Sequence, residues 1–151
     1  MPPAVAGSNP LAGVAALGDQ LLRLQRHRST VYDGVVLESS AFRLLWALAD
    51  GEARTLRQLA EQLDLEQSTI NRQAHAAIDA GYLERFDVAG SASRLLRPTP
   101  EGRAAYEHDG VIRAARYQRV LAALGPERAS SLLEHLTAFN DTWDAAVAAE
   151  A

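Results

Sequence analysis

A run of short polar and basic side chains between positions 67 and 75 has the residue types that bind nucleic acid. Arg72 carries a forked, permanently charged group that suits guanine edges and phosphates, and Asn71 carries an amide that suits adenine edges. The hydroxyls of Ser68 and Thr69 suit phosphates. The candidate DNA contacts are Gln67, Ser68, Thr69, Asn71, Arg72 and His75, followed further along by Arg85 and Arg94. The alternative for the same residues is a solvated helix face, with His75 as a spectator.

The charge of the whole chain does not favour binding to a polyanion. All 15 basic residues are arginines, and 19 acidic residues outnumber them, which gives a formal net charge of −4 at pH 7. Such a balance excludes attraction through a bulk positive field. Between positions 67 and 97, however, four arginines face three acidic residues. The candidate contacts therefore lie in the less acidic part of the chain, and we expect only a modest dependence of DNA binding on salt.

The chain lacks the residues that most catalytic and metal-binding sites need. The chain has no cysteine, which excludes disulfides, thiolate zinc sites and cysteine nucleophiles. It has no lysine, which excludes a P-loop and Schiff-base chemistry. The four histidines are scattered and do not show the spacing of three or four residues that places two ligands on one helix face: His27, His75, His108 and His135. We expect neither an enzyme nor a bound metal or cofactor.

Length and composition indicate one globular domain. The 151 residues are 48% hydrophobic and 23% charged, close to the globular average. No apolar run approaches the roughly 18 residues that a membrane span requires. The first 13 residues lack the positive charge of a secretory signal. We therefore expect a cytoplasmic protein.

The spacing of apolar residues predicts helices around the candidate contacts. Leucines and valines recur every three or four residues from Leu11 to Leu24 and again from 37 to 49, where Ser39 or Ser40 is placed to cap the helix. Thr55 is placed to cap a short helix over 56–63 with its hydroxyl. Ser68 is placed to cap the next helix, which turns Ile70, Ala74, Ala77 and Ile78 inward and ends at Gly81.

The period of the pattern changes after Gly81. Segments 83–86 and 94–97 flank a turn-rich spacer and predict a β-hairpin. Thr99 and Pro100 then mark the start of a long helix, because a hydroxyl before proline is typical of a helix N-terminus. This helix ends at Leu124, before Gly125 and Pro126, and a last helix covers the remaining residues.

This order of elements, together with four motifs, resembles the MarR family of bacterial transcriptional regulators. The motifs lie at residues 37–45 (LESSAFRLL), 56–65 (LRQLAEQLDL), 68–72 (STINR) followed by 81–85 (GYLER), and 99–102 (TPEG). The resemblance implies a mainly α fold, a winged helix-turn-helix with a short β-hairpin wing, flanked by N- and C-terminal dimerisation helices. We expect one intertwined domain with three parts: a flexible tail (1–10), dimerisation helices (11–34 and 101–151) and a winged DNA-binding region (35–100).

Two positions depart from the family pattern. Ala41 stands where the family usually has glutamine. At the wing tip the family usually has Asp-x-Arg, whose arginine enters the minor groove, whereas positions 90–92 here are Gly, Ser and Ala. Either Arg94 replaces the missing arginine, or the wing contacts only the DNA backbone, or DNA affinity is low.

The resemblance also implies partners. It predicts a homodimer, a repressor on double-stranded DNA, with operator half-sites about 10 to 10.5 base pairs apart. It further implies a small aromatic or phenolic effector near the junction of the first two helices, with candidates His27, Arg28, Tyr32, Phe42, Arg43 and Trp46. The alternative for Phe42 and Trp46 is a place in the core or at an interface. Arg113, Arg116 and Arg119 read as a solvated face or an interface. The alternative function is a dimeric helical adaptor that has lost DNA binding.

Overall fold

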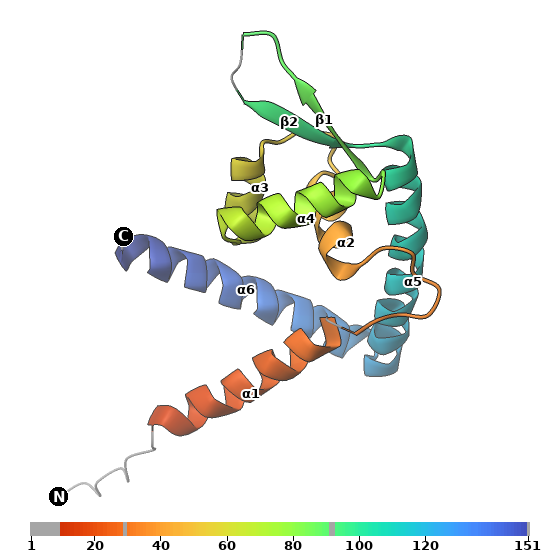
Figure 1. Cartoon of the computed structure of the whole chain (residues 1–151). Coiled ribbons are helices and arrows are strands. Elements are labelled where there is room, and N and C mark those ends of the chain that lie inside the picture. Colours follow the sequence, from red (N-terminus) through yellow and green to blue (C-terminus); the bar gives the residue numbers. More distant parts are fainter. Residues whose placement is uncertain (1–9, 29, 91–92, 151) are drawn as a thin grey trace, which may run out of the picture.

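The computed structural model describes residues 10–28, 30–90 and 93–150. Within this part of the chain, six helices and one two-stranded hairpin follow one another (Figure 1): α1 (Pro10–Arg28), α2 (Ser39–Ala47), α3 (Leu56–Leu63), α4 (Gln67–Asp79), β1 (Leu83–Asp87), β2 (Arg94–Pro98), α5 (Pro100–Leu124) and α6 (Pro126–Glu150). The predicted mainly α winged helix-turn-helix is confirmed. The predicted tail lies outside the described residues except for Pro10, which opens α1.

The core lies where α2, α3, α4 and the hairpin meet. Its largest side chains are fully buried and come from all of these elements: Leu44, Leu45, Leu48, Leu59, Ile70, Leu83 and Leu96. Burial of this apolar surface is the main term that holds the winged region together. Because α4 contributes only one of its faces to the core, its opposite face is left to solvent.

The predicted cap of α3 is confirmed. The Thr55 hydroxyl accepts a hydrogen bond from the Gln58 amide (3.2 Å), and the Gln58 side chain accepts one from the Thr55 amide (2.9 Å). This reciprocal pair satisfies two of the amides that a helix start leaves unpaired. The first turn of the helix-turn-helix is thus specified locally.

The predicted serine caps of α2 and α4 are wrong. Glu38 precedes α2 and Glu66 precedes α4, and neither N-cap side chain forms a capping bond. The helix over 37–49 is shorter than predicted because the amide of Leu37 is bonded to the distant Asp109 (2.9 Å), which keeps it outside the helix. In α4 the first helical bond runs from Ile70 N–H to the Glu66 carbonyl (3.0 Å), so Ser68 already lies inside the helix.

The predicted hairpin and the predicted start of α5 are confirmed. Strands β1 and β2 pair antiparallel, with Leu83 opposite Pro98 and Asp87 opposite Arg94. At the start of α5, the Thr99 hydroxyl accepts a bond from the Gly102 amide (2.9 Å) and Pro100 occupies the first turn. The helix ends at Leu124, before Gly125, as predicted.

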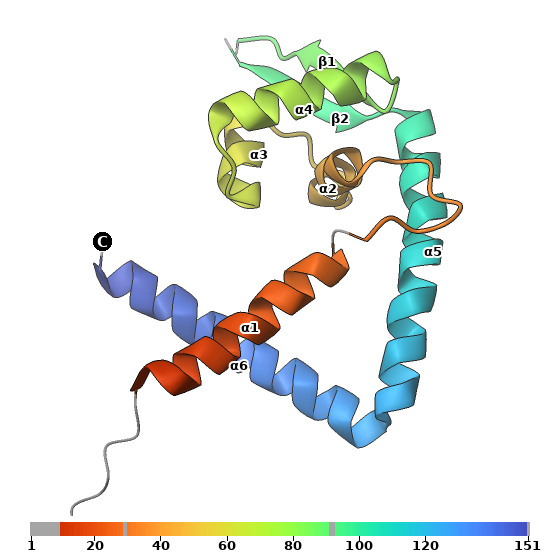
Figure 2. The ribbon, with the colours of Figure 1, turned by 60° about the horizontal axis from the view of Figure 1, so that its bottom comes forward.

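Helices α1 and α6 lie away from the winged region, which α5 connects to α6 (Figure 2). No residue of α6 is buried. Large apolar side chains stay exposed on both helices and on the second half of α5: Val14, Leu17, Leu21, Leu22, Leu24, Val111, Tyr117, Val120, Leu121, Leu132, Leu133, Leu136, Trp143 and Val147. An apolar surface this extended usually marks a protein interface. None of the described helices has the length and apolar character that crossing a membrane requires.

Candidate nucleic-acid interface

Helix α4 separates a buried face from an exposed polar face. Ile70, Ala74 and Ala77 are buried against α2, α3 and β1, and Ile78 is partly buried, as the spacing predicts. The opposite side carries four exposed side chains at spacings of three and four residues: Ser68, Asn71, Arg72 and His75. We call these four residues the α4 polar face. Gln67 is exposed beside it, whereas Thr69 is half-buried at its edge.

The side chains of the α4 polar face are mostly free to bind another molecule. Within the described residues Arg72 forms no ion pair, so its guanidinium donors are available. The His75 ring is held by a bond between its Nδ1 atom and the carbonyl oxygen of Asn71, at 2.8 Å. Short polar groups and one arginine on a rigid helix match what the major groove of DNA accepts.

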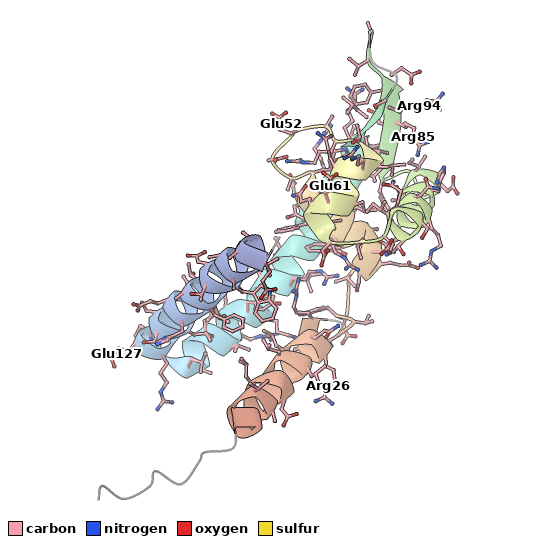
Figure 3. The ribbon with its side chains drawn as sticks, turned by 90° about the vertical axis from the view of Figure 1, so that its left-hand side faces the viewer. Arg26, Glu52, Glu61, Arg85, Arg94 and Glu127 are labelled. Atoms are coloured by element: carbon pink, nitrogen blue, oxygen red, sulfur yellow. The ribbon has the colours of Figure 1, made fainter. Side chains whose placement is uncertain are left out.

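The wing places two predicted contacts on the side where α4 lies. Figure 3 shows Arg85 and Arg94 leaving the hairpin toward that side. Arg94 Nε lies 3.1 Å from a carboxylate oxygen of Asp87, and both side chains are mostly exposed. Because exposed ion pairs contribute little stability, a phosphate can replace Asp87 at low cost. Arg85 is half-buried, and its buried Nη2 has no hydrogen-bond partner among the described residues.

The other face of the wing is occupied within the hairpin. Arg97 Nε lies 2.6 Å from a carboxylate oxygen of Glu84, and its guanidinium stacks over the ring of Phe86 at 4.6 Å. The third basic residue of the wing is therefore already paired. Of the atypical wing tip, residues 91 and 92 lie outside the described residues.

A second cluster forms between α5 and the segment that enters α2. The guanidinium of Arg113 lies over the rings of Phe42 (4.1 Å) and Tyr32 (5.2 Å), and that of Arg116 lies over Tyr32 (4.4 Å). Phe42 also packs on Tyr106, with ring centroids 5.0 Å apart. The Nε atom of Arg113 is buried and has no hydrogen-bond partner in the described part of the chain. We call Tyr32, Phe42, Arg113 and Arg116 the aromatic–arginine cluster.

The aromatic–arginine cluster is held in place by Asp109. This carboxylate is fully buried, and its two oxygens accept hydrogen bonds from the amides of Val36 and Leu37, both at 2.9 Å. His108 adds a bond from Nε2 to the carbonyl of Gly34 (2.9 Å). The loop before α2 is thereby fastened to α5, which positions the rings under the arginines.

The structure brings together only part of the predicted effector set. Tyr32 and Phe42 meet in the aromatic–arginine cluster, whereas four other candidates lie exposed: His27, Arg28, Arg43 and Trp46. The sequence predicts a solvated face or an interface for Arg113 and Arg116; both guanidiniums instead lie over aromatic rings, with Arg113 half-buried and Arg116 exposed. Their spacing of three residues places them on one side of α5, but no local signal pairs them with rings more than 70 positions earlier.

The turn before α3 contains a perturbed carboxyl group. Arg54 donates two hydrogen bonds to the carboxylate of Asp50, one of them at 2.8 Å, and a further one to the carbonyl of Ala47 (2.8 Å). The Arg54 guanidinium, aided by the Glu52 amide, lowers the pKa of Asp50 from its ordinary 3.8 to about 2. This pair ties the end of α2 to the start of the helix-turn-helix.

Comparison with known proteins agrees with this arrangement. Residues 37–95 match the model of the MarR family. No curated protein matches the sequence. Three solved structures share the fold. The PcaV transcriptional regulator from Streptomyces coelicolor, in complex with its natural ligand, is 22% identical over 91% of this chain and 98% of its own (TM-score 0.67).

The other two structures cover a ligand-regulated protein and a DNA complex. Bordetella bronchiseptica BpsR, whose DNA binding 6-hydroxynicotinic acid regulates, is 23% identical over 83% of this chain and 98% of its own (TM-score 0.69). A mutant MarR from E. coli complexed with operator DNA is 15% identical over 87% of this chain and 99% of its own (TM-score 0.73). At these identities the likeness shows the fold.

Proposed function

We propose that this chain, whose residues 37–95 match the model of the MarR family, is a member of that family and a homodimeric repressor that binds a pseudo-palindromic operator. The observation that supports this best is the α4 polar face. Its four side chains are exposed, while the opposite face of the same helix is buried in the core. In this arrangement the N-terminal half of α4 enters the major groove, and Arg85 and Arg94 of the wing contact the flanking backbone.

The homodimer is supported by the apolar side chains that the single chain leaves uncovered. Leu17, Leu21 and Leu24 of α1 lie at helical spacing on one face, and each is more than two-fifths exposed. Leu133 and Trp143 of α6 are still more exposed, at 69% and 61%. In a symmetric dimer, a second copy covers these exposed apolar side chains. The two α4 helices then face successive major grooves of the DNA. Two weak contacts then act together, which compensates for the few cations of each subunit.

The proposed effector is a small aromatic acid that binds at the aromatic–arginine cluster. Arg113 and Arg116 supply positive charge, and the buried Arg113 Nε supplies a donor without a partner among the described residues. Tyr32, which is buried, and Phe42 stack under these guanidiniums and hold them in position to bind the carboxylate of the acid. The loop that Asp109 holds joins Tyr32 of the cluster to α2, which carries Phe42, so we expect a bound ligand to change how the winged region sits against α5. The ligands of PcaV and BpsR support this proposal by analogy.

A gel-shift titration with the DNA that flanks the gene tests the proposal. Wild-type protein is expected to shift one fragment at low and moderate salt, with affinity falling as salt rises. Arg72→Ala is expected to lose about 1 to 3 kcal/mol of binding free energy, because it removes a base or phosphate contact. Arg128→Ala in α6 removes another exposed arginine, far along the chain, and serves as the charge control. No shift at micromolar protein favours the adaptor alternative.

The effector is tested separately by calorimetry with 6-hydroxynicotinic acid and 4-hydroxybenzoate. Wild-type protein is expected to bind one of these acids and to release DNA on binding. Arg113→Gln is expected to lose the acid while still binding DNA. Arg119→Gln changes a neighbouring exposed arginine of α5 and is expected to bind as wild type does. Equal affinity of both variants for the acid contradicts a role for the cluster.

A further inference from the structure

We infer that His75 selects for an exocyclic amino group, that of adenine or cytosine, through an Nε2 atom that acts only as a hydrogen-bond acceptor. This inference rests on the proposed DNA-binding function and assigns one base-reading position of the α4 polar face. It specifies which strand carries the amino group at one base pair of each half-site.

His75 Nδ1 is bonded to the carbonyl oxygen of Asn71, at 2.8 Å. A carbonyl oxygen can only accept a hydrogen bond, so Nδ1 must carry the proton. In a neutral imidazole the other ring nitrogen then has a lone pair and no hydrogen. The bond therefore fixes the orientation of the ring and, in the neutral ring, leaves Nε2 as an acceptor.

The position of His75 directs that nitrogen toward a ligand. The side chain is exposed and shares the α4 polar face with Ser68, Asn71 and Arg72. Asn71 uses its backbone carbonyl in the bond, which leaves its side-chain amide available. From position 67 to 76, every other exposed polar side chain is an amide, a hydroxyl or a guanidinium, and each of these can donate. His75 is the one member of this stretch that presents a pure acceptor.

A pure acceptor discriminates among base edges in the major groove. Adenine and cytosine present an amino donor there, whereas guanine and thymine present only acceptors and the thymine methyl. Nε2 therefore bonds to the first pair and faces two lone pairs on the second. Arg72 lies three residues before His75 on the same face and can only donate, which suits guanine. The two side chains together favour a guanine close to an adenine or cytosine within each half-site.

The same type of bond also occurs in α6, where His135 Nδ1 bonds to the carbonyl of Ser131 at 2.5 Å. The bond by itself is thus a feature of histidine in a helix. Its consequence for recognition at position 75 comes from the place of that residue on the α4 polar face. His135→Ala is therefore the matched control for His75→Ala.

The test begins with selection of DNA sites from randomised duplexes by wild type, H75A, H75Q and H135A. Wild type and H135A are expected to select the same half-site. H75A is expected to lose its preference at one position, where wild type selects adenine or cytosine. H75Q is expected to keep part of that preference, because its amide oxygen also accepts. Circular dichroism checks that each variant is folded.

The second step removes only the amino group at that position. Adenine is replaced by the purine deoxyribonucleoside, or cytosine by 2-pyrimidinone, in one otherwise unchanged duplex. Wild-type affinity is expected to fall about 10-fold, since a good base contact contributes about 1 to 3 kcal/mol of discrimination. The affinity of H75A is expected to stay the same.

Each outcome bears on the inference in a defined way. DNA binding with an unchanged H75A preference, or full tolerance of the missing amino group, overturns the inference and leaves the proposed function standing. Failure of wild type to bind any duplex overturns both. Loss of binding by H135A to the same extent as H75A shows a structural effect and also overturns the inference.

Discussion

Gly102, in the first turn of α5, lies directly against the backbone carbonyl of Tyr82, at the exit of α4. A Cβ atom at position 102 would come within 2.0 Å of that oxygen. Thr99 strengthens the contact, since its amide bonds to the Tyr82 carbonyl (3.0 Å) and its hydroxyl donates to the Gly81 carbonyl (2.6 Å). The end of the proposed reading helix is thus locked to the start of the helix that leads toward α6.

Gly102→Ala is expected to destabilise the protein by about 3 kcal/mol, because backbone on both sides of the contact must move to admit a methyl group. Gly110→Ala is the control on the same helix, where nothing lies within 4 Å of an added Cβ atom. It is expected to be neutral or to stabilise by up to about 1 kcal/mol, since alanine favours the helix. Urea unfolding measures both variants. Equal stability of the two would show that the contact is not tight in solution.

Asp109→Asn tests the link between α5 and the loop before α2. An amide has only one oxygen for the two amides of Val36 and Leu37, and its NH2 group then faces a donor. We expect a loss of about 2 kcal/mol in unfolding free energy and faster hydrogen exchange at Val36 and Leu37. Asp33→Asn, at an exposed position of the same loop, serves as control. Unchanged exchange at both amides would contradict the anchoring role.

Local signals predicted the helix starts only where the capping partner is itself local. Thr55 and Thr99 each bond to an amide three residues later, and both caps follow from the sequence. Ser39 and Ser40 look equally suitable. However, the start of α2 is determined by Asp109, which lies 72 residues after Leu37. The spacing of neighbouring residues does not reveal a contact between positions so far apart.

In the candidate site too, the features that depend on local spacing could be predicted from the sequence, and those that depend on distant contacts could not. The faces of α4 follow from helical periodicity, because every buried position is an apolar residue at the expected spacing. The partners of the wing arginines do not, since they depend on the strand register that places Asp87 opposite Arg94 and Glu84 opposite Arg97. The aromatic–arginine cluster could not be predicted from the sequence for the same reason, because its rings and its arginines lie on elements that are far apart in the chain.

Arg54→Met is expected to raise the pKa of Asp50 from about 2 back toward 3.8, because the guanidinium is the main cause of the depressed value. A depressed carboxyl pKa stabilises the folded state above 3.8, and this contribution disappears as the pH falls through about 2. The wild type should therefore lose stability in that window through Asp50, and the variant should not. Titration of the Asp50 carboxyl by NMR measures the pKa. Arg57→Met, which breaks the pair with Glu61, should leave it unchanged.

Leu21→Glu is expected to convert the proposed dimer to a monomer, because it places a charge in the exposed apolar stripe of α1. Loss of a buried leucine alone corresponds to about 3 kcal/mol, or roughly a 100-fold higher dissociation constant. Ala16→Glu adds the same charge on the face that also carries Asp19 and Arg23, and it should leave the dimer intact. Analytical ultracentrifugation reports the assembly, and operator binding should weaken with it, since the second α4 no longer contributes. A wild-type monomer at every concentration would refute the dimer and the paired half-sites.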